Sequence, residues 1–339
     1  MKKNPNHEYG KRPTLKDISL KAGITITSVS RALKGCSNIS PATQERVRNI
    51  AMELGYISNP HAQSLRNGHF PVIAIVYDNF KNPFYSIVTG MIDALIREHN
   101  YRSMVFYEFN QDIRLGVNAA KEISAFNLSG VISFLVPTQE AIDLFKLHNI
   151  PLIIIGRDGA PLYIASVSSN DIQGGYLAGK HLFNTGARKM AYIGAGSNLP
   201  INQNRLDGFM KALNEQGLAP LIYLNDENIP TEAVLDKALK DQPDLNGIFC
   251  FNDLMAFEVI NRLMELNYQI PKDVAVIGYD NLQRYINYPF RLTTIDADMQ
   301  KTAALVVSSI FEQLQTHSNV PNNQIVNVDL IVGKTTKKI

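Results

Sequence analysis

The chain has 339 residues, of which 45% are hydrophobic and 19% are charged. This composition indicates a soluble folded protein and excludes a largely disordered chain, and the length predicts a small module beside a larger body. No apolar run approaches the roughly 20 residues of a membrane-spanning helix, so no membrane partner is expected. The basic N-terminus lacks the apolar stretch of a signal peptide, so we expect a cytoplasmic protein.

The charge is distributed unevenly along the chain. Residues 1–69 contain eleven Lys and Arg but four Asp and Glu, whereas the remaining residues contain 22 and 27. A basic head on an acidic body favours a polyanionic partner for the head, and a solvated basic tail is the alternative. The two cysteines, Cys36 and Cys250, are far apart, and no histidine pair has a ligand-like spacing. We therefore expect neither a disulfide framework nor a metal site, and no cofactor.

Three short helices are predicted after a flexible basic arm at residues 1–12. Thr14 and Asp17 form a capping box for the first, and Gly23 ends it in a tight turn. Thr25 is the cap of the second, and Ser40-Pro41 opens the third. Two capped helices joined by a glycine turn predict a helix-turn-helix domain over residues 13–57.

The second helix has one face suited to DNA. Its stretch 25–35 reads TITSVSRALKG, and Val29 and Leu33 lie on the face that packs on the core. Thr27, Ser30 and Arg31 face outward with Ile26 beside them. Arginine can read guanine with two hydrogen bonds, and an apolar side chain can meet a thymine methyl. A surface helix without a partner is the alternative.

Residues 58–70 are predicted to link the head to the body. The segment contains SNPHAQSLRNGH, in which Asn59 can cap a short helix that Gly68 ends. Leu65 is apolar in a polar linker and stands next to Arg66, and such a residue can insert between base steps in the minor groove. A plain linker is the alternative.

The body alternates apolar β-rich runs with amphipathic helical stretches. Near-continuous Val and Ile runs predict parallel strands covered on both faces, and there are too many for one sheet. We therefore predict two α/β lobes. The strand candidates are 72–77, 104–107, 130–135, 152–156, 165–168, 189–194, 221–224, 247–251 and 274–278, with 293–298 and 326–332 crossing between the lobes or completing them.

Polar residues follow several of these strands, where ligands bind in α/β folds. For any single one, a turn or helix cap is the alternative, and the recurrence at four strand ends carries the prediction. Carboxylates, amides and arginine over apolar walls suit hydroxyl-rich ligands. The predicted ligand-binding residues are Asp78, Asn79, Phe84, Arg157, Arg205, Asn252 and Asp280.

Catalytic motifs are not apparent in the sequence. GAGSN at residues 194–198 has two glycines after a strand, but no third glycine completes a dinucleotide fingerprint. No nucleophile elbow, P-loop or His/Glu metal motif is present. We therefore expect a protein that is not an enzyme.

The chain resembles the LacI/GalR family of transcription regulators. The resemblance spans nearly the whole chain in the family's order. It is carried by TLKDISLKAG (14–23), TSVSRAL (27–33), NPHAQSLR (59–66), NPFYS (82–86), RLDGF (205–209), FNDLMAF (251–257), PKDVAVIGYDN (271–281) and LTTI (292–295).

This resemblance implies a small all-α helix-turn-helix head on a two-lobed type I periplasmic-binding-protein-like α/β body. It implies a homodimer on a pseudo-palindromic operator in double-stranded DNA. By the family's motifs, Ile26, Thr27 and Arg31 read bases and Leu65 is the minor-groove wedge. The full set of expected DNA contacts is Thr14, Ile26, Thr27, Ser30, Arg31, Asn59, Leu65 and Arg66.

The family's effector contacts fall on Arg205, Asn252 and Asp280, which its members use mainly for sugar hydroxyls. Arg157 is not a usual residue of the family and hints at a charged or unusual ligand. The lobes are expected at residues 71–168 with 298–325, and at 169–297 with 326–339.

The sequence thus predicts a dimeric repressor switched by a small effector, with a carbohydrate as the expected class. A purine, a nucleoside or a phosphoprotein partner is an alternative within the family. Outside the family, the alternatives are a solute-binding protein without a DNA role and an enzyme acting on a sugar or nucleotide in the cleft.

Overall fold

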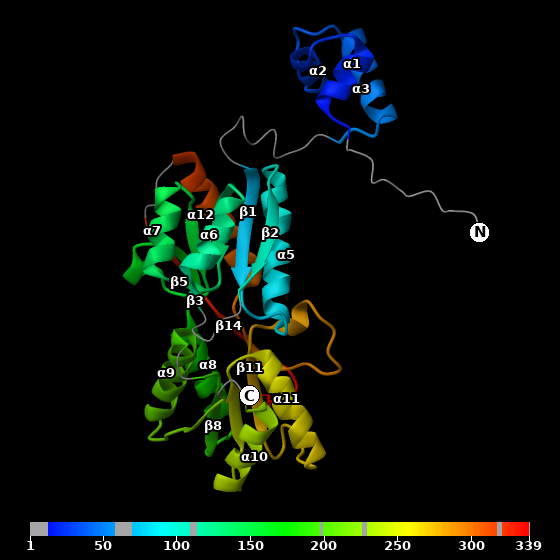
Figure 1. Ribbon diagram of the computed structural model, residues 1–339. Coiled ribbons are helices and arrows are strands. Elements are labelled where there is room, and N and C mark those ends of the chain that lie inside the picture. Colours follow the sequence, from blue (N-terminus) through cyan, green and yellow to red (C-terminus); the bar gives the residue numbers. More distant parts are fainter. Residues whose placement is uncertain are drawn as a thin grey trace, which may run out of the picture. The chain divides into compact units, whose positions relative to one another are not determined.

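The structure is a computed structural model of residues 1–339 (Figure 1). It describes residues 13–57, 70–108, 114–196, 199–225, 229–316 and 321–338. The predicted arm at 1–12 and almost all of the predicted linker therefore lie outside the described residues. The chain divides into two compact units, Met1–Gly68 and His69–Ile339, which we call the head and the body.

The head contains helices α1 (Leu15–Ala22), α2 (Ile26–Leu33) and α3 (Pro41–Glu53). Each start agrees with the predicted cap, because the side chains of Thr25 and Ser40 accept backbone N–H groups of α2 and α3. Gly23 ends α1 with φ of 65°, a conformation that favours glycine. A small core fills the space between the helices, built from Ile18, Ala22, Val29, Ala32, Val47 and Ala51.

The body contains two α/β lobes, and each has a six-stranded sheet (Figure 1). The first sheet, in the N-lobe, has the order β13-β7-β6-β4-β1-β2, and all its strands are parallel. These strands are β1 (Phe70–Tyr77), β2 (Arg102–Tyr107), β4 (Leu128–Ser133), β6 (Leu152–Ile155), β7 (Ala165–Ser169) and β13 (Asn323–Val326).

Helices cover both faces of the N-lobe sheet. Alternate residues of β1 show this, because Ile73 and Ile75 pack against α5 (Pro83–Glu98) and α12 (Met299–Thr316). Val72 and Ala74 pack on the other side against α6 (Val117–Ala125) and α7 (Gln139–Leu147). A small parallel pair, β3 (Arg114–Leu115) with β5 (Val136–Pro137), completes this lobe together with the short helix η1 (Ala160–Leu162).

The second sheet, in the C-lobe, has the order β14-β12-β11-β10-β8-β9. Its strands are β8 (Met190–Gly194), β9 (Leu221–Leu224), β10 (Gly247–Cys250), β11 (Ala275–Tyr279), β12 (Thr293–Asp296) and β14 (Asp329–Ile331). Only the edge pair β12–β14 of this sheet is antiparallel. Helices α8 (Asp171–Asn184) and α9 (Pro200–Asn214) cover one face, and α10 (Thr231–Asp241) and α11 (Asp253–Glu265) cover the other.

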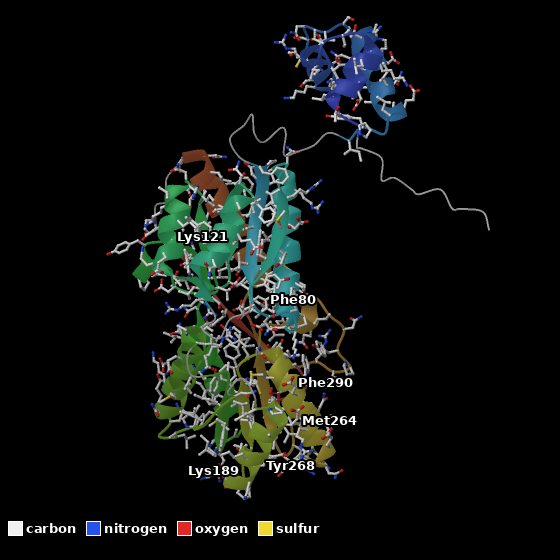
Figure 2. The ribbon with its side chains drawn as sticks, in the orientation of Figure 1. Phe80, Lys121, Lys189, Met264, Tyr268 and Phe290 are labelled. Carbon is white, nitrogen blue, oxygen red and sulfur yellow. The ribbon has the colours of Figure 1, made fainter. Side chains whose placement is uncertain are left out.

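The chain crosses between the lobes at residues 169–171, 296–299 and 326–329. The carboxyl ends of both sheets consequently face one another. Figure 2 shows Lys189, just before β8, at the end of the C-lobe far from the N-lobe, whereas Phe80, just after β1, lies near the junction of the lobes. A short helix at this junction, η2 (Leu282–Arg284), brings fully buried Leu282 into the N-lobe core.

Glycines allow α8 and α9 to pack backbone against backbone. A Cβ on Gly208 of α9 would lie 1.9 Å from the carbonyl oxygen of Ile172, and one on Gly175 of α8 would lie 1.9 Å from that of Arg205. A side chain at either position would push the helices apart. The close approach places the first turn of α8 directly against Arg205.

Candidate functional site

The second helix of the head presents a polar face to solvent. Ala32 and Val29 are fully buried and hold α2 to the core, whereas Ile26 is 46% exposed and Thr27 and Arg31 are also exposed. Ser30, which was predicted to face outward, is half-buried. The exposed face therefore contains an apolar group, a hydroxyl and a guanidinium within one and a half turns.

The other predicted DNA contacts have different positions. Thr14 is exposed at the start of α1, and its hydroxyl donates to Oδ2 of Asp17 at 2.7 Å. Asn59, Leu65 and Arg66 lie outside the described residues. Their contacts with DNA remain predictions.

A cavity of about 490 Å³ lies between the two lobes of the body. All seven residues predicted to bind a ligand line it. Asp78, Asn79, Phe84 and Arg157 come from the N-lobe, and Arg205, Asn252 and Asp280 come from the C-lobe. The structure thus brings together residues more than 200 positions apart in the sequence.

Local hydrogen bonds fix the loops that line the cavity. Oδ1 of Asn79 accepts the N–H groups of Lys81 and Asn82, which closes the turn after β1. Oδ1 of Asn82 then caps α5 by accepting the N–H of Phe84 at 3.0 Å. Asn252 caps α11 in the same way, accepting the N–H of Met255 at 2.9 Å. Helix starts from both lobes therefore face the cavity, so the positive ends of their dipoles point toward it.

Arg205 is the most strongly held cation of the cavity. Its Nε donates to Oδ1 of Asp171 at 2.8 Å, and its Nη1 donates to the carbonyl of Phe251 at 2.6 Å. Its guanidinium carbon lies 3.5 Å from the ring centroid of Tyr279, and Asp280 is 3.8 Å from Nη2. Burial alone would lower the pKa of Arg205, but Asp171 and its other partners raise it above the ordinary value. Arg205 therefore stays charged and pre-oriented.

Asp280 lies in a turn that buried Asp253 holds in place. Oδ2 of Asp253 accepts the N–H of Leu282 at 2.7 Å, and its Oδ1 accepts the hydroxyl of Thr294 at 2.5 Å. Asp280 itself has φ of 106° and is 4% exposed. Burial raises the pKa of Asp280 to about 7, despite the opposing influence of Arg205. Near neutral pH this carboxyl can either donate or accept a hydrogen bond.

The N-lobe wall combines Arg157 with aromatic rings. Arg157 follows β6 and Gly156, and its Nε donates to the carbonyl of Phe134 at 3.2 Å. The rings of Tyr85 and Phe134 meet edge to face at 5.1 Å, and both line the cavity with Phe84. Aromatic faces beside polar groups suit sugars and bases alike.

No cluster of His, Cys, Asp and Glu suited to hold a metal ion occurs in the described part of the chain. Among the helices described, none is long and apolar enough to cross a membrane.

Two family models match separate parts of the chain. Residues 14–59 match the model described as bacterial regulatory proteins, lacI family. Residues 180–336 match the model described as a periplasmic binding protein-like domain. The head therefore contains a lacI-family helix-turn-helix domain, and the body contains a periplasmic binding protein-like domain. The predicted combination of a helix-turn-helix head with a two-lobed periplasmic-binding-protein-like body is thereby confirmed.

Curated relatives align over nearly the full chain. The HTH-type transcriptional repressor PurR of Vibrio vulnificus (strain CMCP6) is 27% identical, and the alignment covers 96% of this chain and 99% of that protein. The sucrose operon repressor of Pediococcus pentosaceus is also 27% identical, with the same coverage of both chains. These relatives are named as transcription repressors.

Solved structures of other transcription regulators show the same fold. The lac repressor dimer bound to operator and the anti-inducer ONPF matches with a TM-score of 0.82 at 24% identity, covering 96% of this chain and 99% of that one. The complex of the transcriptional regulator CelR with cellobiose matches with a TM-score of 0.69 at 22% identity, covering 96% and 100%.

Several residues of the site were missed by the sequence reasoning. Asp171 comes two residues after β7, as the first residue of α8, so the rule that singled out four other strand ends also applied to it. Phe134 and Phe251 follow β4 and β10 directly. Arg205, which was predicted, lies five residues after the start of α9 at Pro200. Further lining residues that were not predicted are Lys81, Asn82, Tyr85, Ser168, Asn225, Thr231 and Glu258.

Proposed function

We propose that this chain is a sequence-specific DNA-binding transcription regulator. It acts as a dimeric repressor whose operator affinity is switched by a small molecule bound between the two lobes. The observation that carries the proposal is the combination, in one chain with a lacI-family head, of the exposed α2 face with the lined cavity. Because its partner is DNA, we place the protein in the cytoplasm, and we assign no catalytic role to the cavity.

The head binds DNA through two kinds of contact in this proposal. Thr27, Ser30 and Arg31, with Ile26 beside them, contact base edges in the major groove. Lysines and arginines of the head contact phosphates and make the affinity depend on salt. Leu65 of the linker inserts into the minor groove, and Asn59 and Arg66 of the same segment contact the DNA beside it. The domain division predicted from the sequence is retained here as part of the proposal.

The body transmits the ligand signal in this proposal. Leu282 supports this role, because it follows Asp280 by two residues yet packs in the N-lobe core. A ligand that binds Asp280 and the N-lobe wall together would draw the lobes toward each other and shift that contact. Coupling between ligand and operator is reciprocal, with a typical free energy of about 1–3 kcal/mol.

A carbohydrate is the proposed ligand class. Asp78, Asn252, Asp280 and Arg205 supply hydrogen-bonding groups for hydroxyls, and Phe84 supplies an apolar face. The likeness to a sucrose operon repressor and to a cellobiose complex supports this choice. A purine or nucleoside is the second candidate, because the rings of Tyr85 and Phe134 provide faces for stacking, and PurR proteins are among the relatives.

A thermal-shift screen of the full chain tests the ligand class. The panel contains mono- and disaccharides, purines and nucleosides. A ligand at about 100 times its Kd adds about 2.7 kcal/mol to the stability of the folded state. Stabilisation by a sugar supports the carbohydrate proposal, and stabilisation by purines or nucleosides alone replaces it with the second candidate. A panel without any stabilising compound contradicts both classes.

A further inference from the structure

The two arginines of the cavity differ in how their charges are compensated. Arg205 has a carboxylate partner at 2.8 Å and a carbonyl partner at 2.6 Å. Within the described part of the chain, Arg157 makes one hydrogen bond, from Nε to the carbonyl of Phe134. Among the residues that the structure describes, no carboxylate lies within 4.0 Å of the Arg157 guanidinium. Its two terminal nitrogens are therefore available to a ligand.

A half-buried guanidinium without an ion-pair partner costs free energy. Burial lowers the pKa of Arg157, although Tyr85, Asp78 and Asp171 oppose this shift. Such a cost is normally offset by a bound anion or a nearby carboxylate. The terminal nitrogens of an arginine match the paired oxygens of a phosphate or carboxylate group.

Lys81 adds a second positive charge to the same side of the cavity. It is exposed, lines the cavity at its edge, and has no ion pair among the described residues. The first turn of α5 lies beside it and directs the positive end of the helix dipole inward. Asp78 opposes these charges, but burial raises the pKa of its carboxyl even though Arg157 lowers it.

We propose that the ligand of this cavity carries an anionic group, a phosphate ester or a carboxylate, bound by Arg157 with Lys81 at the edge. The inference rests on the proposed function, because it takes the cavity as the effector site. The rest of the ligand lies toward Asn252, Asp280 and Arg205, which bind hydroxyl groups. A neutral sugar would leave Arg157 without an ion-pair partner, with only the more distant charges of Asp78 and Asp171 to offset its burial.

Inorganic phosphate is the first probe, because it tests the anion site without knowledge of the whole ligand. The melting temperature of the full chain is measured in rising phosphate at constant ionic strength, with chloride as reference. We expect a saturable rise of about 2 °C. Arg157→Gln should abolish this rise. Lys121→Gln, which removes a charge from α6 of the same lobe outside the cavity (Figure 2), should preserve it.

Phosphate bound by the basic head would stabilise wild type and Arg157→Gln equally, so the difference between these proteins reports on the cavity. An equal rise in wild type and Arg157→Gln, or no saturable rise in wild type, overturns the inference.

Matched ligand pairs then identify the source of the anion by calorimetry. The pairs are ribose with ribose 5-phosphate, glucose with glucose 6-phosphate, and glucose with glucuronate. We expect one charged member to bind at least tenfold more tightly than its parent, and Arg157→Gln to remove that preference. Preference for a phosphorylated or for a carboxylated member assigns the group. Tighter binding of the neutral parents overturns the inference but leaves the proposed repressor function intact. The repressor function fails only if the chain selects no DNA sequence.

Discussion

Asp171 and Arg205 form a buried ion pair across the contact between α8 and α9. Both side chains are about 95% buried, and Oδ1 of Asp171 lies 2.8 Å from Nε of Arg205. The pair joins the first crossing between the lobes to the wall of the cavity. It orients the guanidinium before any ligand arrives, which is how a binding site avoids the cost of reorganisation.

Asp171→Ala should therefore destabilise the protein by about 3–5 kcal/mol, because it leaves a buried arginine without its partner. Ligand binding should weaken as well, since Arg205 loses its orientation. Asp207→Ala is the matched control, because it removes an exposed carboxylate from α9 that bonds only Gln203 among the described residues. Urea denaturation measures both variants. Similar, small effects of the two substitutions would show that the ion pair contributes little.

Gly208→Ala should disrupt the packing of α8 on α9. The new methyl group would lie 1.9 Å from a backbone oxygen, so we expect a loss of about 3 kcal/mol or more in the free energy of unfolding. Gly90→Ala on α5 is the control, because a Cβ there meets no atom within 4 Å. It should stabilise the protein by about 0.5–1 kcal/mol, since alanine favours helix. Comparable destabilisation by both would contradict the close helix approach.

Asp280 should make stability depend on pH. Its pKa is about 7 in the folded protein and 3.8 as the ordinary value, so the folded state retains a proton that the unfolded state has lost between these limits. The contribution of Asp280 to the free energy of unfolding is therefore complete below about pH 4. It decreases as the pH rises from about 4 and is lost once the pH has passed 7. Relative to wild type, Asp280→Asn should become more stable from pH 4 to 7 and change little above it. A pH-independent difference in melting temperature would refute the raised pKa.

Arg31→Ala should weaken binding to the operator by about 1–3 kcal/mol and relax the preference at one base position. The fold of the head should persist, because Arg31 is exposed and the core of α2 is intact. Met52→Ala on α3 is the control, because Met52 is 72% exposed on another helix. Fluorescence anisotropy with labelled operator DNA gives both affinities. An equal loss in the two variants would remove Arg31 from the interface.

Strand positions could be predicted closely where both faces of a strand are buried. The run 152–156 predicted β6 to within one residue, because an all-apolar stretch has a single interpretation there. The predicted strand 130–135 was displaced by two residues from β4, since Phe134 and Leu135 are buried without being in the sheet. Edge strand β2 begins at Arg102, two residues before its prediction, because half-exposed edges tolerate polar residues.

The candidate site could be predicted in part. Residues such as Asn252 and Asp280 follow strongly apolar strands, so their position at the sheet edge follows from the chain order. The partner of Arg205 could not be predicted, because it depends on how closely α8 and α9 approach. That approach depends on tertiary packing at Gly175 and Gly208, which no local periodicity reveals.

The central claim is most directly tested by selecting DNA from a random-sequence library with the full chain. A dimer related by two-fold symmetry, each head carrying one α2 helix, should enrich an inverted repeat of two half-sites. Binding to the selected sequence should weaken steeply with salt and should change when the cavity ligand is added. Recovery of such a repeat would support the proposed repressor. Recovery of no enriched sequence, with binding that depends on charge alone, would contradict it.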